Sequence, residues 1–246
     1  MPSYQTLQVR GRTFVAGDLH GCLSPLQSIL KQVHFSAENG DVCVLLGDLT
    51  DRGPDSLGCL ALLDQPGIYS IQGNHEQMCS AALHNQSLGM YCWLGNGGNW
   101  FHELSMEAQQ QVREYWLPKI ERLPLVIDLF TAEQLHIGIC HADPVFNDWQ
   151  TLLTALDTYQ AEERETLIEK LIWSRERISL ATKTNFLPGA FQINGLDWCI
   201  MGHTPIRPTP FRKGNCIWID SGAVFPNGYL SVLEIGRELH CHQARL

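Results

Sequence analysis

The N-terminal half of the chain alternates between short apolar runs and segments whose apolar residues have helical spacing. The apolar runs, which predict strands, lie at residues 13–17, 41–46 and 68–72. Helical spacing follows the first run at Leu26, Ile29, Leu30 and Val33. We expect this helix to begin with an N-cap at Ser24, a second helix to begin at Pro54–Asp55, and a third to cover 76–86. Such alternation favours a sheet with crossover helices.

The second half of the chain begins with helical patterns and ends in strands. Helices are predicted over 105–117 and 151–172, and strands at 124–130, 135–140, 197–201, 216–220 and 229–235. We expect the last three strands to pair antiparallel through Pro- and Gly-containing turns. The sequence shows neither an internal repeat nor a linker, so we expect one α/β domain over residues 1–246.

Residues with metal-binding side chains follow five of the predicted strands. They are Asp18, His20, Asp48, Asn74, His141 and His203. Because ligands bind at the carboxyl ends of strands in α/β sheets, we expect these residues to meet at one edge. Oxygen and imidazole donors suit Mn, Fe and Zn, and six donors sharing a bridging carboxylate would hold two metals about 4 Å apart.

Composition narrows the class of protein. The formal charge is −9, 44% of residues are hydrophobic and 17% are charged, which is ordinary globular composition. The acidic balance argues against a nucleic-acid partner. The sequence contains neither a long apolar segment nor an apolar region near its start, so we expect a cytoplasmic protein with no membrane partner. The nine cysteines form no C-x-x-C pair and are expected to be mostly buried thiols.

The order of the motifs resembles that of a known family. GDLHG, GDLTDRG, GNHE, HAD and GHT resemble the signature of the PPP-type metallophosphoesterases. The stretches GNHEQM, NGGNWF, HADPVF, WSRERIS, GHTP and IDSGAVF are similar to bacterial and bacteriophage lambda-type serine/threonine protein phosphatases, from about residue 13 to 235. The resemblance implies a calcineurin-like α/β fold, with a central β-sandwich of mixed sheets flanked by helices. It also implies that phosphorylated proteins or peptides are the substrate, and it leaves phosphotyrosine open.

The resemblance assigns roles to individual residues. It implies that Asp18, His20 and Asp48 hold a first metal, and that Asp48, Asn74, His141 and His203 hold a second. We expect two divalent ions, with manganese favoured over iron, zinc or magnesium.

The remaining roles concern proton transfer and phosphate binding. The resemblance implies that His75 is the general acid, that Asp51 orients it, and that Arg52 and Arg175 bind phosphate. The register of Arg175 against Arg177 stays open, and a salt bridge on a helix surface is the interpretation favoured for Arg177.

Three other functions share parts of this pattern. A symmetrical diadenosine tetraphosphate hydrolase is the nearest alternative, although such enzymes tend to lack the carboxylate at Asp51 and to have GNHD in place of GNHE. A cyclic-nucleotide phosphodiesterase and a non-catalytic phosphoprotein-binding protein are weaker alternatives. Three tryptophans fall near the expected cleft, and packing is favoured over a role in substrate binding for Trp93, Trp100 and Trp149.

Overall fold

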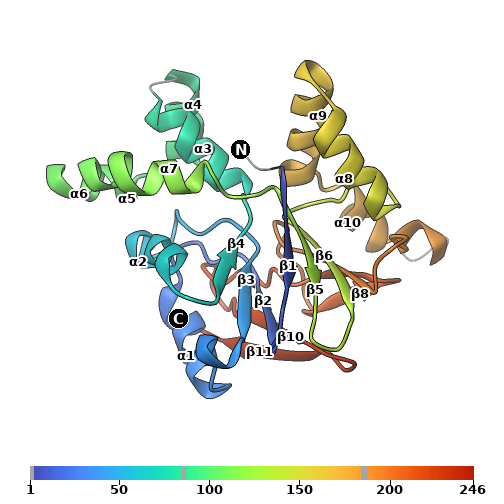
Figure 1. The fold of residues 1–246 in the computed structure, drawn as a ribbon. Helices are drawn as coiled ribbons and strands as arrows, with labels where there is room; N and C mark the ends of the chain where they lie inside the picture. Colours follow the sequence, from blue (N-terminus) through green and yellow to red (C-terminus); the bar gives the residue numbers. More distant parts are fainter. Residues whose placement is uncertain (1–2, 85–86, 184–187) are drawn as a thin grey trace.

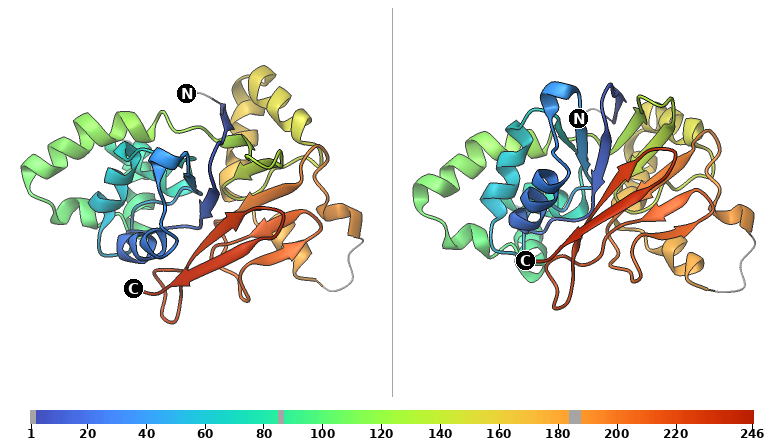
Figure 2. Two further views of the ribbon diagram at one scale, coloured as in Figure 1. Left: turned by 60° about the horizontal axis from the view of Figure 1, so that its bottom comes forward. Right: turned by 90° about the horizontal axis from the view of Figure 1, so that it is seen from below.

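Two β-sheets pack face to face between helices in the computed structural model, which describes residues 3–84, 87–183 and 188–246 (Figures 1 and 2). The strands are β1 (Tyr4–Gln8), β2 (Thr13–Ala16), β3 (Val42–Leu45), β4 (Ile68–Ser70), β5 (Val126–Phe130), β6 (His136–Cys140), β7 (Trp198–Met201), β8 (Phe211–Lys213), β9 (Cys216–Trp218), β10 (Leu230–Ile235) and β11 (His240–Ala244). One sheet has the order β1-β5-β6-β7-β9-β8 and the other β11-β10-β2-β3-β4. The predicted β-sandwich of mixed sheets is confirmed.

The helices lie on the two outer faces and in one long excursion. The α-helices are α1 (Leu23–Gln32), α2 (Ser56–Ala61), α3 (Asn74–Leu83), α4 (Ser87–Gly95), α5 (Trp100–Glu103), α6 (Met106–Gln111), α7 (Leu117–Ile120), α8 (Trp149–Thr158), α9 (Ala161–Trp173) and α10 (Glu176–Ala181). A π-helical turn, Val112–Trp116, joins α6 to α7, and short 3₁₀ turns cover Ala37–Asn39, Leu62–Asp64 and Pro188–Phe191. In Figure 1, α3 to α7 and α8 to α10 stand on opposite sides of the strands.

The predicted strand–helix alternation of the N-terminal half is confirmed. Strands β2, β3 and β4 pair in parallel, and α1 and α2 are the crossover helices between them. The start of the second helix is also correct, because the Asp55 carboxylate accepts a hydrogen bond from the Gly58 amide at 2.8 Å. The N-cap predicted at Ser24 is wrong. Ser24 lies inside α1, and Cys22 precedes the helix without a side-chain cap.

The expected pairing of the last three strands is wrong. Strands β7 and β9 run parallel, because the chain first forms β8 and then turns back into β9 as an antiparallel hairpin. Strand β10 belongs to the other sheet, where it pairs antiparallel with both β2 and β11. The helix predicted over 151–172 is two helices, since the chain is extended at Tyr159 and Gln160.

Three layers of apolar side chains hold the sandwich together. The layer between the sheets contains aliphatic residues such as Val15, Val44 and Ile137, all fully buried. On one outer face Phe14 packs against the N-terminal helices. On the other, Trp149 at the start of α8 belongs to an apolar cluster that joins α8 and α9 to β5, β6 and β7. Burial on both faces explains the continuous apolar runs of β2 and β3. The last residues of these two strands, and those of β6 and β7, are fully buried.

The cysteines behave as expected from the sequence. None of the nine forms a disulfide; Cys92 is exposed, Cys241 is partly exposed and the other seven are buried. No helix in the described part of the chain is long and apolar enough to cross a bilayer.

Candidate metal centre

Both sheets contribute side chains to one buried cluster. Asp18 and His20 follow β2, Asp48 follows β3, and Asn74 and His75 begin α3 after β4. His141 follows β6 and His203 follows β7 in the other sheet. Several of these positions have left-handed backbone conformations, with φ of 44° at His20, 48° at Asp48 and 64° at His203. Such conformations are costly for residues other than glycine and concentrate at functional sites.

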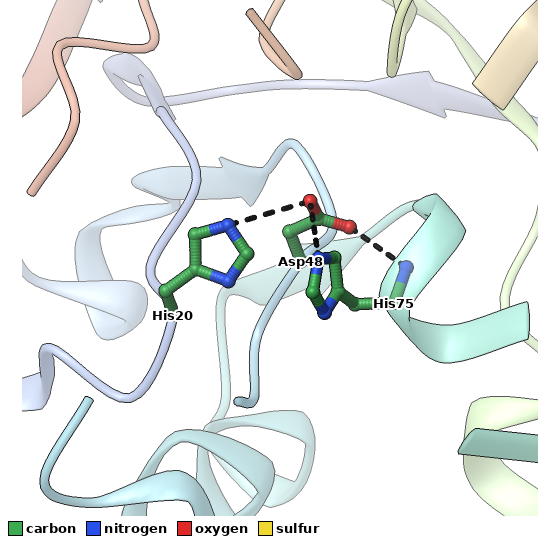
Figure 3. A group of neighbouring side chains, drawn as sticks. All are labelled: His20, Asp48 and His75. Carbon is green, nitrogen blue, oxygen red and sulfur yellow. Dashed lines mark hydrogen bonds and ion pairs between the residues drawn. The ribbon is translucent and has the colours of Figure 1, made fainter. Parts of the chain in front are cut away.

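The Asp48 carboxylate lies at the centre of this cluster. Its Oδ2 is 3.6 Å from His20 Nε2 and 3.9 Å from His75 Nε2, and the two imidazoles approach it from different segments in Figure 3. Its Oδ1 accepts the His75 backbone N–H at 3.0 Å and lies 3.5 Å from His141 Nε2. Two sets of potential metal ligands share this carboxylate: His20, Asp48 and His75, and Asp48, His141 and His203.

The orientation of His141 leaves unprotonated atoms facing one another. Its Nδ1 donates to the Leu46 carbonyl at 2.6 Å, so Nε2 of the neutral ring carries a lone pair. That lone pair faces Asn74 Oδ1 at 3.0 Å and Asp48 Oδ1 at 3.5 Å. His203 adds Nδ1 at 3.0 Å from the same Asn74 oxygen. A group of acceptors converging on one point is an arrangement that a cation satisfies.

Burial favours the neutral form of three imidazoles of the cluster, those of His20, His141 and His203. It lowers the pKa of His20 to about 3 and that of His203 to about 3, and it also lowers the pKa of His141. Neutral imidazole is the form that coordinates metals. Burial alone would raise the pKa of Asp48, but this pKa is lowered. The interactions with His141, His75 and His20, together with the hydrogen bond from the His75 backbone N–H, outweigh burial and hold the pKa of Asp48 well below its usual range.

Two further carboxylates make the cluster strongly acidic. Asp18 accepts the His203 backbone N–H at 3.0 Å, and burial together with the charges of Asp220 and Asp48 raises its pKa. Burial raises the pKa of Asp220, which follows β9, to about 7. The predicted ligand Asp18 thus lies against the His203 segment and is absent from both ligand sets among the described residues. Buried acids beside neutral imidazoles fit divalent cations.

Sequence reasoning gave Asp220 no role. It stands in the IDSGAVF stretch, so its place after an apolar run was the available signal.

Glu76, the last residue of GNHE, is a second functional residue to which the sequence analysis gives no role. Its carboxylate accepts backbone N–H groups of Asp48, Leu49 and Gly73, each at 2.8 Å. Burial and the Asp48 charge raise the pKa of Glu76 to about 7. Glu76 therefore fixes the turn that carries Asp48 against the start of α3.

His75 and Asp51 form a buried pair beside the cluster. His75 Nδ1 is 2.6 Å from Asp51 Oδ2. Burial pulls the pKa of His75 down, but the charge of Asp48 and the hydrogen bond and charge of Asp51 outweigh it, so the pKa is raised. The structure thus brings together the residues predicted as general acid and orienting carboxylate.

Arg52 extends across the same two imidazoles. Its Nη1 donates to His20 Nε2 at 2.7 Å and its Nη2 to His75 Nε2 at 2.9 Å. The Asn96 and Gly97 carbonyls accept its Nε and backbone N–H at 3.2 Å each. A cation on the lone pair of His20 Nε2 would therefore have to displace the Arg52 Nη1 donor.

The two arginines of the WSRERIS stretch have different environments. Arg175 precedes α10 and lines a cavity of about 520 Å³ together with Glu176, Ser179, Leu180 and Lys183. Its charge acts on His141, His203 and Asp220. Arg177 is buried, and its Nε is 3.1 Å from Asp143 Oδ1. The salt bridge predicted for Arg177 is present, but the predicted helix-surface location is wrong.

The fold and site define a metallophosphoesterase. The family model described as calcineurin-like phosphoesterase matches residues 11–207, and the chain belongs to this family. It is an enzyme of the hydrolase class. "Serine/threonine-protein phosphatase 1" of Salmonella typhimurium is 37% identical over 94% of this chain and 96% of its own. "Serine/threonine-protein phosphatase 2" of Escherichia coli is 33% identical over 96% of this chain and 100% of its own.

More distant proteins are similar in sequence or in fold. The asymmetrical bis(5'-nucleosyl)-tetraphosphatase PrpE of Oceanobacillus iheyensis is 26% identical over 87% of this chain and 84% of its own. A solved structure described as a putative diadenosine tetraphosphatase superposes with a TM-score of 0.64 at 21% identity, covering 99% of this chain and 98% of the other. That structural likeness concerns the fold alone.

Proposed function

We propose that the protein is a metal-dependent protein phosphatase that removes phosphate from phosphoserine and phosphothreonine residues. The observation that carries the proposal is the His75–Asp51 contact of 2.6 Å, with His75 Nε2 3.9 Å from the Asp48 carboxylate. This contact holds the His75 imidazole in one orientation at the edge of the acidic cluster, where Nε2 can carry a proton once the Arg52 guanidinium has moved away from it. Relatives named serine/threonine-protein phosphatases, at 33–37% identity over most of the chain, support the same substrate class.

We propose that two divalent ions, with manganese favoured, are held by Asp18, His20, Asp48, Asn74, His141 and His203. Bound there, the ions would neutralise phosphate charge and activate a water near neutral pH. The acceptors that converge around Asn74 and the shared position of Asp48 support this assignment. Because His75 also belongs to one of the ligand sets, its assignment as acid rests on its bond to Asp51 rather than on its distance from Asp48.

Phosphate binding, proton donation and positioning are then carried out by side chains of the protein. Arg52 and Arg175 bind the phosphate oxygens, since a guanidinium offers several donors in one plane. Asp51 holds Nδ1 of His75. Once Arg52 leaves Nε2 to bind the phosphate and the imidazole is protonated, Nε2 delivers its proton to the departing serine or threonine oxygen. Glu76 keeps Asp48 and the start of α3 in register through its backbone contacts.

A bis(5'-nucleosyl)-tetraphosphatase is the second candidate function. Relatives of that name match most of the chain at 24–26% identity, lower than the protein phosphatases. The carboxylate at Asp51, bonded to His75, favours the protein phosphatase.

Further features of the proposal concern the chain as a whole. We propose a single domain over residues 1–246, because the two sheets share the buried layer between them. We also propose a bacterial, cytoplasmic enzyme without a nucleic-acid or membrane partner, for which the bacterial relatives and the acidic charge are the support.

The test compares substrates on one metal-loaded preparation. The protein is stripped of metal, reloaded with single divalent ions, and assayed on p-nitrophenyl phosphate, a phosphoserine peptide, a phosphotyrosine peptide and diadenosine tetraphosphate. We expect the phosphoserine peptide to have a higher kcat/KM than the dinucleotide, with the highest activity in manganese. A preference for the dinucleotide would replace the leading function with the second. The variant His75→Asn, which keeps a polar side chain, should lose phosphopeptide turnover by about 10²-fold or more.

A further inference from the structure

Two indole N–H groups converge on the carboxylate that orients His75. Trp93 Nε1 is 2.9 Å from Asp51 Oδ2 and 3.0 Å from Oδ1, and Trp100 Nε1 is 2.6 Å from Oδ1. With His75 Nδ1 at 2.6 Å, three N–H groups surround one fully buried carboxylate. An indole N–H can only donate, so both tryptophans hold the carboxylate oxygens in a fixed position.

The backbone of Asp51 adds to this arrangement. Its φ of 76° lies in the left-handed region, which an aspartate adopts at a cost. Its N–H donates to the Ser56 hydroxyl at 3.0 Å. The side-chain and backbone contacts together define a single position for the carboxylate.

The two tryptophans lie on an excursion that is remote from Asp51 in sequence. Trp93 belongs to α4 and Trp100 begins α5, between β4 and β5. Between the two tryptophans, Gly97 and Gly98 allow the backbone to pack closely against the GDLTDRG segment, which contains Asp51 and Arg52. A Cβ on Gly97 would lie 2.7 Å from the Arg52 side chain, and one on Gly98 would lie 2.5 Å from the Trp93 ring. The NGGNW turn thus fits directly over Asp51 and Arg52.

We infer that Trp93 and Trp100 are positioning residues for proton transfer to the leaving group, acting through Asp51 on His75. The inference rests on the proposed role of His75 as general acid. A carboxylate without its indole donors would be free to rotate, and Nδ1 of His75 would lose its fixed partner. Replacing either tryptophan should therefore lower kcat/KM most for substrates whose leaving group must be protonated as it departs.

The chain contains a matched control. Trp149 is as buried as Trp93 and donates its Nε1 to Asp128 Oδ1 at 2.8 Å, but it packs beneath the other sheet. Trp149→Phe removes the same indole–carboxylate bond without touching Asp51. A change in activity that follows from losing any indole–carboxylate bond will appear in all three tryptophan variants. A change that is transmitted through Asp51 will appear only in the variants of Trp93 and Trp100.

The experiment measures kcat/KM on phenyl phosphate and on p-nitrophenyl phosphate with the metal-loaded enzyme. The two substrates are similar in shape, but the phenolate is a stronger base and depends more on protonation. His75→Asn should lower the phenyl to p-nitrophenyl ratio by about tenfold or more. Trp100→Phe and Trp93→Phe should lower it in the same direction by about threefold to tenfold. Trp149→Phe should leave the ratio unchanged.

A second measurement tests whether the effect passes through Asp51. In the Asp51→Asn background, Trp100→Phe should change the ratio by less than about twofold, because the carboxylate on which it acts is gone. Full additivity would overturn the inference, and so would an equal loss on both substrates in Trp100→Phe. If Trp93→Phe does not fold, the half-buried Trp100 still decides the question. If His75→Asn itself leaves the ratio unchanged, the acid role and the inference both fail; if only the tryptophan variants do, the inference alone fails.

Discussion

Arg177 and Asp143 form a buried ion pair, with Nε 3.1 Å from Oδ1, that joins the start of α10 to the loop after β6. The same carboxylate accepts the backbone N–H groups of Val145 at 2.8 Å and Arg177 at 3.3 Å. Asp143 lies two residues after His141, and Arg177 lies two residues after Arg175. The pair therefore connects the segment of a proposed metal ligand to the segment of a proposed phosphate-binding residue.

Removing the arginine of this pair should destabilise the protein strongly. Arg177→Met leaves the Asp143 charge buried without its partner, for which we expect a loss of about 3–5 kcal/mol in the free energy of unfolding. Urea unfolding of the metal-free protein measures it. The double variant Asp143→Asn with Arg177→Met should be less destabilised than the sum of the two single variants. Simple additivity would show that the two side chains do not depend on each other.

Glu76 should not tolerate replacement by glutamine. Its two oxygens accept three backbone N–H groups, and the amide nitrogen of a glutamine would turn a donor toward at least one of them. We expect Glu76→Gln to lower the free energy of unfolding by about 2–4 kcal/mol. Calorimetry of the purified variant checks the loss. Glu121→Gln is the control, since that carboxylate accepts only side-chain donors near the surface; an equal loss there would contradict the special role of Glu76.

Asp41 should make part of the stability depend on acid pH. Burial acts to raise its pKa, but hydrogen bonds from the Arg12 side chain and backbone and from the Ser36 backbone outweigh it and lower the pKa below 3.8. The folded state thus binds the proton more weakly than the unfolded state does. The contribution is complete above about pH 4 and is lost as pH falls through the lowered pKa.

Asp41→Asn reveals this contribution directly. The variant should be less stable than the parent by about 1–3 kcal/mol near pH 7, and the difference should shrink as pH falls below about 4. Urea titrations across this range provide the measurement. Asp64→Asn removes an exposed carboxylate paired with Lys119 and should have the smaller effect. A difference that stays constant with pH would argue against titration of Asp41.

Without bound metal, the buried carboxylates of the acidic cluster should lower the stability of the folded protein. Burial raises the folded-state pKa of Asp220 to about 7, against 3.8 ordinarily, so its ionised form destabilises the folded protein as pH rises between these values. In the metal-free protein near pH 8, Asp220→Asn should therefore raise Tm. In the manganese-loaded enzyme, the same variant should gain less in Tm, because the cations offset the carboxylate charge in the parent. Equal gains in both states would contradict a cation near Asp220.

Much of the site could be predicted because its residues follow continuous apolar runs. Strands β2, β3 and β6 are buried on both faces, so their hydrophobic signal is strong and their ends are marked by a glycine or a histidine. Strands β1, β8 and β11 were missed. Each lies at a sheet edge and carries polar or exposed residues, so its pairing depends on a neighbour distant in sequence.

By itself, the sequence determined the parallel β2–β3–β4 unit and the set of residues at the strand ends, because local spacing and turn chemistry encode both. Tertiary structure alone decided that β7 and β9 run parallel and that Arg177 is buried. It also decided that Trp93 and Trp100 donate to Asp51 across more than forty positions of sequence. These relationships arise when two sheets and a helical excursion close over one another. The residues that then meet have no spacing along the chain by which the contact can be recognised.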